Sequence, residues 1–259
     1  MIRKFLAASA IATSFLIGST ATHAATIDFG FALDESGSIN AADFALATSG
    51  LANALSQIPT SGDDTFRISV VAFSTIARTI VPVTDVTADN IAGIQDAIRG
   101  IEQASQFTAV NRAIDLLTAN FAEVGFGDTS LFNVTTDGNT NVNTLGESVV
   151  AATAAGLDGL SFETVLSGVI DPNRLVDLAF PGTPLLIDDV ADIPNATETG
   201  FVLEVASFLD YEDAINAKVE RFVADTTSPS PVPLPAGMPL ILVGLAAFGG
   251  LRIKRNSAA

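Results

Sequence analysis

The sequence FALDESGSINAADF (residues 31–44) passes from an apolar run into a segment whose apolar residues recur at helical spacing. The run at 26–34 predicts a buried strand, and the pattern at 41–58 predicts the helix that follows it. A polar turn rich in aspartate, glutamate and serine separates the two. In an open α/β sheet, ligand-binding groups lie at the carboxyl ends of strands, which is the position of this turn.

Three side chains of this turn, those of Asp34, Ser36 and Ser38, occupy alternate positions. Carboxylate and hydroxyl oxygens are hard donors that suit Mg²⁺ or Mn²⁺ better than softer metals. Alternate residues of one loop can point at a single ion, and Gly37 eases the turn between them. The alternative is that these residues only cap the helix beginning near Ala41, because serine and aspartate favour such positions.

Strand and helix patterns alternate through the rest of the middle of the chain. Further strands are predicted at 67–74, 77–83, 130–137, 160–169 and 200–207, and further helices at 88–101, 110–124, 145–156 and 211–225. The strands at 67–74 and 77–83 have a tight connection, so we expect an antiparallel pair, and Pro82 suits an edge strand. The pattern predicts an α/β fold with a doubly wound, mostly parallel six-stranded sheet, one antiparallel edge strand, and helices on both faces.

A second acidic residue, Asp137, ends the predicted strand at 130–137 in the sequence NVTTDG. The carboxyl ends of parallel strands share one edge of a sheet, so Asp34 and Asp137 are expected to approach each other. The alternative is that Asp137 and Gly138 only form a turn. We expect Glu35 to face solvent and Phe73 and Phe132 to lie in the core.

The D-x-S-x-S sequence at the end of the first strand resembles the metal-ion-dependent adhesion site (MIDAS) of von Willebrand factor type A (VWA) domains, shared with integrin inserted domains. The resemblance spans residues 25–225 and implies that the threonine of SQFTAVNRAI completes the site. The implied ligands are Asp34, Ser36, Ser38, Thr108 and Asp137. The implied cofactor is Mg²⁺, or else Mn²⁺ or Ca²⁺, with an open coordination position that attracts a carboxylate from a partner protein.

The chain departs from the family pattern in two places. Phe107 precedes Thr108, where the family usually has glycine, and 171–200 is longer and more irregular than the usual last connection. Thr108 alone is also an ordinary residue for the start of a helix. The segment 137–143 resembles a calcium loop but lacks the acidic spacing of an EF-hand, so we interpret it as a polar loop.

The amino-acid composition excludes several classes of catalytic and metal site. There is no cysteine, and the only histidine is His23, so a mature chain without that residue has no histidine base, thiolate or imidazole metal ligand. Residues 25–225 hold 29 acidic and 7 basic residues, a charge that repels nucleic acid and anionic membranes and favours divalent cations or basic partners. The alternative is that the acidic surface mainly keeps the protein soluble.

The N-terminus has the layout of a secretory signal peptide over residues 1–24. Arg3 and Lys4 precede an apolar stretch at 5–17 that is short for a membrane span, and cleavage is expected after Ala24. The alternative is an uncleaved anchor.

The C-terminus contains a Ser/Thr/Pro linker at 226–231 and a three-part segment at 232–259. The sequence VPLPA, the apolar run at 238–251 and a basic tail resemble the VPLPA type of the PEP-CTERM sorting signal. The resemblance implies processing by an exosortase-type transpeptidase, transient or permanent membrane anchoring, and delivery to the surface or matrix of a Gram-negative bacterium. Plain membrane anchoring is the alternative.

Together these features predict an exported, non-enzymatic module that binds a carboxylate-bearing protein through a divalent metal. Ser36 lies outside any G-x-S-x-G elbow, and Asp34 lacks the second acid of a D-x-D phosphatase loop. Two alternatives are a structural matrix protein with a purely stabilising metal and a metal-assisted hydrolase.

Overall fold

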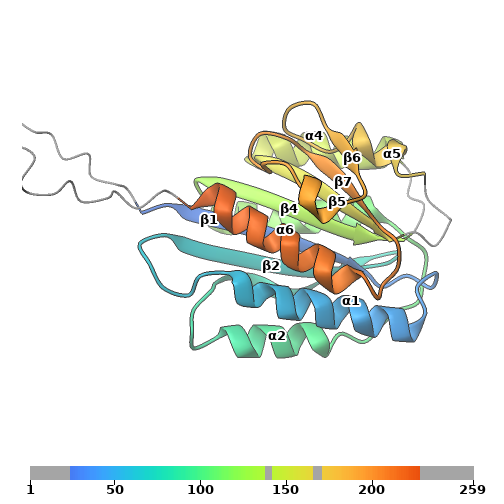
Figure 1. The fold of residues 1–259 in the computed structure, drawn as a ribbon, viewed down its shortest axis with the longest axis horizontal. Helices are drawn as coiled ribbons and strands as arrows, with labels where there is room; N and C mark the ends of the chain where they lie inside the picture. Colours follow the sequence, from blue (N-terminus) through green and yellow to red (C-terminus); the bar gives the residue numbers. More distant parts are fainter. Residues whose placement is uncertain (1–23, 138–141, 166–170, 228–259) are drawn as a thin grey trace, which may run out of the picture. The chain divides into compact units, whose positions relative to one another are not determined.

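The computed structural model describes residues 24–137, 142–165 and 171–227 (Figure 1). The predicted signal peptide up to residue 23, and the predicted linker and sorting signal from residue 228 onward, lie outside the described residues. Residues 24–227 contain both hydrophobic clusters and the whole described sheet, so this part of the chain has a self-contained core. In the part of the chain that the structure describes, no helix is both long and apolar enough to cross a membrane.

The sheet has the order β3-β2-β1-β4-β5-β7-β6. Its strands are β1 (Thr26–Asp34), β2 (Thr65–Phe73), β3 (Ala77–Asp85), β4 (Thr129–Thr136), β5 (Gly159–Val165), β6 (Leu185–Ile187) and β7 (Phe201–Val205). All neighbours are parallel except β2 and β3, which confirms the antiparallel edge strand. The α/β class and mostly parallel sheet are therefore confirmed, with one strand more than the six expected.

Helices cover both faces of the sheet, as predicted (Figure 1). The longer helices are α1 (Ala41–Ala54), α2 (Ile91–Arg99), α3 (Val110–Val124), α4 (Val142–Ala155) and α6 (Tyr211–Thr226). One apolar cluster joins α1, α2 and α6 to one face, and the other joins α3 and α4 to the opposite face. Phe73 and Phe132 are fully buried in the second cluster, so the expectation that they belong to the core is confirmed.

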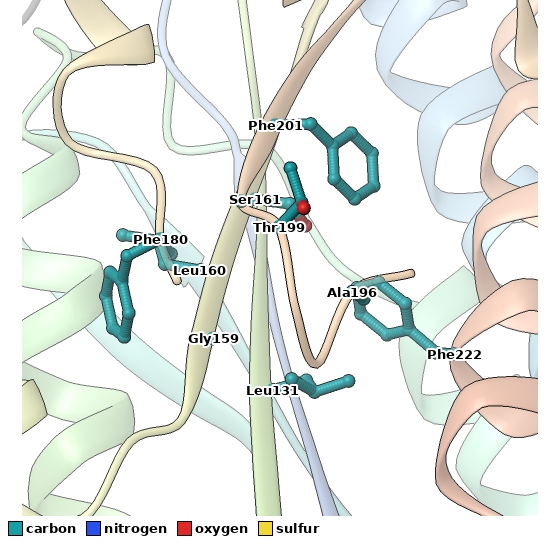
Figure 2. Close-up of a pocket in the computed structure, with 10 residues that line it drawn as sticks. Leu131, Gly159, Leu160, Ser161, Phe180, Ala196, Thr199, Phe201 and Phe222 are labelled. Carbon is teal, nitrogen blue, oxygen red and sulfur yellow. The ribbon is translucent and has the colours of Figure 1, made fainter. Parts of the chain in front are cut away.

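The additional strand comes from the irregular segment 171–200. This segment contains the short helix α5 (Asn173–Val176), β6 and the 3₁₀ turn η2 (Val190–Asp192). Phe180 pairs through its backbone with Leu160 of β5. Figure 2 shows Leu160 and Phe180 on one side of the sheet, and Phe201 and Phe222 on the other. The space that these residues line is too small to hold a water molecule, so they do not form a ligand site.

Close backbone approach fixes where this segment lies. The Gly200 amide donates to the Pro181 carbonyl at 2.6 Å, and a Cβ at Gly200 would overlap the backbone of Phe180. Because β6 then pairs in parallel with β7, the insertion extends the sheet by one strand. Short strands of three residues carry too little periodicity to be recognised in a sequence.

A buried ion pair attaches α6 to the sheet. Lys218 Nζ lies 2.8 Å from Glu163 Oε1 on β5 and donates to Asn133 Oδ1 on β4 at 2.6 Å. Asn133 Nδ2 and Thr135 Oγ1 both donate to Glu163 Oε2, and Thr135 shares a hydrogen bond with the Tyr211 hydroxyl. The Lys218 and Glu163 side chains are fully buried, so this polar network sets where α6 lies on the sheet.

Candidate metal centre

Four of the five predicted ligands form one hydrogen-bonded set at the carboxyl ends of β1 and β4. Asp34 Oδ1 accepts from the Ser36 amide at 2.8 Å. The Ser36 and Ser38 hydroxyls are hydrogen-bonded at 3.0 Å, and Ser38 Oγ donates to Asp137 Oδ1 at 2.7 Å. Ser38 and Asp137 are 99 positions apart in the sequence, yet their oxygens are in contact, as the strand pattern predicted.

The other oxygen of Asp34 is held from the neighbouring strand. Thr136 Oγ1 on β4 donates to Asp34 Oδ2 at 2.6 Å. Thr136 lies one residue before Asp137 in the NVTTDG sequence and was not among the predicted site residues. The sequence feature that could have identified Thr136 is its position directly before the acidic end of β4. The parallel pairing of β1 with β4 brings that position beside Asp34.

The loop between β1 and α1 is fixed by the segment that precedes α3. The Ser105 amide donates to the Glu35 carbonyl at 2.9 Å, and the Gly37 amide donates to the Gln106 carbonyl at 2.8 Å. A Cβ at Gly37 would lie 3.1 Å from the Ser105 carbonyl oxygen, so glycine permits this close approach. Gln103 Nε2 also donates to the carbonyls of Ser36 and Ile39.

Thr108, the fifth predicted ligand, follows this anchored segment directly. It is half-buried and stands before Ala109, the N-cap residue of α3, which makes no side-chain capping hydrogen bond. Among the residues that the structure describes, Thr108 lies outside the hydrogen-bonded set formed by the other four. The residues shortly before it, Ser105 and Gln106, are hydrogen-bonded to the Asp34–Ser38 loop, and the role of Thr108 as a ligand stays a prediction.

Glu35 is buried, and the prediction that it faces solvent was wrong. Its side chain is 1% exposed and forms an ion pair with Arg78 of β3, with Arg78 Nη2 2.6 Å from Glu35 Oε2. Arg78 also donates to the Glu102 carbonyl at 2.7 Å. Local alternation could not reveal this pair, because Arg78 comes from a different strand 43 residues away.

The helix-capping alternative for Asp34, Ser36 and Ser38 is not what the structure shows. The cap of α1 is Asn40, whose Oδ1 accepts from the amides of Ala42 and Asp43, each at 3.0 Å. The oxygens of the D-x-S-x-S turn are therefore not needed to cap the helix. Asn directly before a helical pattern was a recognisable cap signal.

Removing this cap should destabilise the protein and leave metal binding unchanged. We expect Asn40→Ala to lower the free energy of unfolding by about 1 kcal/mol, because two amide donors of α1 lose their acceptor. Urea unfolding measures this loss. Metal affinity should stay within about twofold of wild type, and a loss as large as in an Asp34 variant would contradict the separation of the cap from the centre.

Burial raises the pKa values of the two carboxyls at the centre. It raises the pKa of Asp34 from 3.8 to about 6, against the opposing effect of the hydrogen bonds from Ser36 and Thr136, and the charge of Asp137 adds to the rise. Burial also raises the pKa of Asp137, opposed by the Ser38 hydroxyl. A cation would reverse both effects, since it favours the charged form of a nearby carboxyl.

The donor set fits a hard divalent cation. It consists of two carboxylates and three hydroxyls with no nitrogen or sulfur, which suits Mg²⁺, Mn²⁺ or Ca²⁺. Over residues 24–137, 142–165 and 171–227, no group of three or more His, Cys, Asp or Glu side chains is arranged to hold a metal. A cation at this centre would therefore have few charged ligands from the described residues.

Solved structures share this fold at low sequence identity. They include a von Willebrand factor type A protein from Catenulispora acidiphila (14% identity, TM-score 0.59, covering 77% of this chain and 43% of that one). The pilus adhesin SpaC from Lactobacillus rhamnosus GG matches at 11% identity and TM-score 0.59, over 76% and 30% of the two chains.

A third structure is proximal thread matrix protein 1 from the mussel byssus, solved with a zinc-occupied MIDAS motif. It matches at 18% identity and TM-score 0.54, over 76% of this chain and 46% of that one. The chain thus spans less than half the length of each of these three structures. Among curated protein sequences, none matches the chain significantly.

The family comparison agrees with the fold. A family model described as the von Willebrand factor type A domain matches residues 28–198, which run from β1 past β6. This match covers more than half of the chain, so the chain belongs to the von Willebrand factor type A domain family.

Proposed function

We propose that this VWA domain is a binding module that uses a divalent cation to hold a carboxylate of a partner protein. The observation that carries the proposal is the convergence of Asp34, Ser36, Ser38 and Asp137 at one edge of the sheet. The byssus matrix protein with a metal-occupied MIDAS supports a metal at this place in the fold, and the pilus adhesin supports a binding role.

The proposed ligands have distinct roles. Asp34 and Asp137 supply the negative charge, directly or through water, and Ser36, Ser38 and Thr108 supply neutral oxygens. Mg²⁺ is the favoured ion, with Mn²⁺ and Ca²⁺ as alternatives, because oxygen donors suit all three. Bound to so few charges, such an ion provides a local positive site that a partner's carboxylate can occupy.

The proposed activity is binding rather than catalysis. The oxygens of Asp34 accept from Ser36 and Thr136, an arrangement that fixes a metal ligand. The Ser36 hydroxyl is hydrogen-bonded to that of Ser38, and the described residues include no histidine to activate it as a nucleophile. The pilus and byssus proteins that share the fold are an adhesin and a matrix protein, which supports the same interpretation.

We also propose that the domain works outside the cell. The support is the sequence of the two ends: a signal peptide at 1–24, a linker at 226–231, and a VPLPA-type signal at 232–259 for an exosortase-type enzyme. The proposed location is the cell surface or extracellular matrix of a Gram-negative bacterium.

Calorimetric titration of residues 24–227 with Mg²⁺ and Mn²⁺ tests the proposed centre. At pH 7.5 we expect one saturable site, lost in Asp137→Asn. At pH 5 the wild-type affinity should be about tenfold weaker, because the metal must displace a proton from Asp34, whose pKa is about 6. A folded wild type without saturable binding, or unchanged affinity in the variant, would show that this centre does not hold a metal.

A further inference from the structure

Two large apolar side chains are exposed beside the candidate metal centre. Phe107, directly before Thr108, is 85% exposed, and Ile76, in the turn between β2 and β3, is 63% exposed. We call these two residues the apolar rim. Exposed apolar side chains are common when single, but here two of them stand next to the one place where a ligand is proposed to bind.

The backbone holds both residues of the rim in place. The Phe107 amide donates to Thr75 Oγ1 at 3.2 Å, and the Ser74 amide donates to the Ile76 carbonyl at 2.8 Å. Thr75 is the residue before Ile76, so the two segments adjoin. The segment that ends in Phe107 is itself bound to the Asp34–Ser38 loop through Ser105 and Gln106.

The backbone of this segment is constrained as well. Ser105 has a φ of 54°, a left-handed conformation that is uncommon for residues other than glycine. Hydrogen bonds from the Ser105 amide to the Glu35 carbonyl and from the Gly37 amide to the Gln106 carbonyl hold this conformation. These contacts fix the segment that presents the Phe107 side chain to solvent. A glycine at position 107 would present no side chain there.

The charge of the domain makes short-range contacts important for an acidic ligand. Residues 25–225 carry 29 acidic and 7 basic residues, so their long-range field repels a carboxylate. Attraction must then come from the ion itself and from contacts within a few ångströms of it. Burial of apolar surface is such a contact, and it is insensitive to the sign of the field.

We propose that the apolar rim selects partners in which the metal-binding carboxylate has a large apolar side chain as its neighbour in the sequence. This inference rests on the proposed function, because it concerns the surface beside the same metal centre. The rim packs against the neighbouring apolar side chain while the carboxylate occupies the ion. The favoured ligand is therefore an isolated aspartate or glutamate in an apolar segment of a protein.

Two short peptides test the selection. Ac-Gly-Leu-Glu-Leu-Gly-NH₂ and Ac-Gly-Ser-Glu-Ser-Gly-NH₂ differ only in the neighbours of the glutamate, and each is titrated by NMR into residues 24–227 with saturating Mg²⁺. We expect the leucine peptide to bind wild type about tenfold more tightly. Phe107→Ser should reduce this ratio to about twofold, and Ile76→Ser should reduce it to a lesser extent.

Controls distinguish the rim from the centre. Val124→Ser removes a 54% exposed apolar side chain at the far end of α3 and should keep the tenfold ratio. Calorimetry should give the same Mg²⁺ affinity for wild type, Phe107→Ser and Val124→Ser. An equal affinity of wild type for both peptides, or a tenfold ratio that survives Phe107→Ser, would overturn the rim and leave the proposed function standing. Failure of both peptides to bind the Mg²⁺-loaded domain would overturn the two together.

Discussion

Replacing Asp34 by asparagine should abolish divalent-metal binding and at the same time stabilise the metal-free domain. Asparagine keeps the shape of the side chain, and its Oδ1 can still accept from the Ser36 amide, while its Nδ2 can donate to Thr136 Oγ1. The negative charge that a cation requires is lost. We expect no measurable Mg²⁺ binding at concentrations that saturate wild type.

The stabilisation follows from the raised pKa of Asp34. The folded protein binds the proton of this carboxyl more tightly than the unfolded chain, so wild-type stability falls as pH rises from 3.8 to about 6. Above this window the ionised, buried Asp34 costs the metal-free domain about 3 kcal/mol, a cost that asparagine avoids. The advantage of Asp34→Asn should therefore be present at pH 7.5 and largely absent below pH 4.

Urea unfolding in EDTA at pH 7.5 and pH 4 measures this difference, and calorimetry measures the metal affinity. Glu102→Gln is a matched control, because it removes an exposed acidic side chain from the segment between α2 and α3. That variant should retain metal binding and stability within about 0.5 kcal/mol of wild type. Metal affinity that persists in Asp34→Asn would remove Asp34 from the ligand set.

Of the substitutions proposed as tests, the one that breaks the buried ion pair at Lys218 should cause the largest loss of stability. We expect Lys218→Met to lower the free energy of unfolding by about 3–5 kcal/mol, because it leaves the Glu163 carboxylate buried without its cation. Asn133 Oδ1 also loses its donor at 2.6 Å and keeps the longer hydrogen bond from Ser161 Oγ at 3.5 Å. Burial lowers the pKa of Lys218, and Glu163 opposes that effect, so the pair depends on the two charges being present together.

A second variant identifies the cause of this loss. Lys218→Met combined with Glu163→Gln removes both charges and leaves a neutral amide in place of the carboxylate, so the double variant should recover most of the lost stability. Urea unfolding followed by circular dichroism measures wild type and both variants. If Lys218→Met costs less than about 1 kcal/mol, or if the double variant is no more stable than the single one, the ion pair does not anchor α6.

The sequence predicted the elements that carry strong local signals. The strand at 26–34 and the helix at 110–124 each have a clear pattern, and both appear in the structure at those bounds. The antiparallel pair was predictable from the short connection between the second and third strands. The strand β6 was not, because three residues in an irregular segment owe their conformation to pairing with β7 rather than to their own pattern.

The candidate centre was predictable where it depends on strand ends. Asp34 and Asp137 meet because parallel strands place their carboxyl ends together. Contacts between side chains from distant elements were not predictable from the sequence. Lys218 lies on the buried stripe of α6 that includes Tyr211 and Phe222, but nothing local in the sequence identified Glu163 as its partner. Only the fold brings those charges together.

The two margins of the sheet bear on how copies of the domain behave when crowded. At one margin β3 contains Pro82, which has no amide hydrogen, and its register with β2 shifts twice. At the other margin β6 is only three residues long and is followed by Asp188 and Asp189. Neither margin offers a long, regular row of free amides and carbonyls, so strand addition between molecules is disfavoured. A dense layer of these domains would therefore resist fibril formation through their sheets.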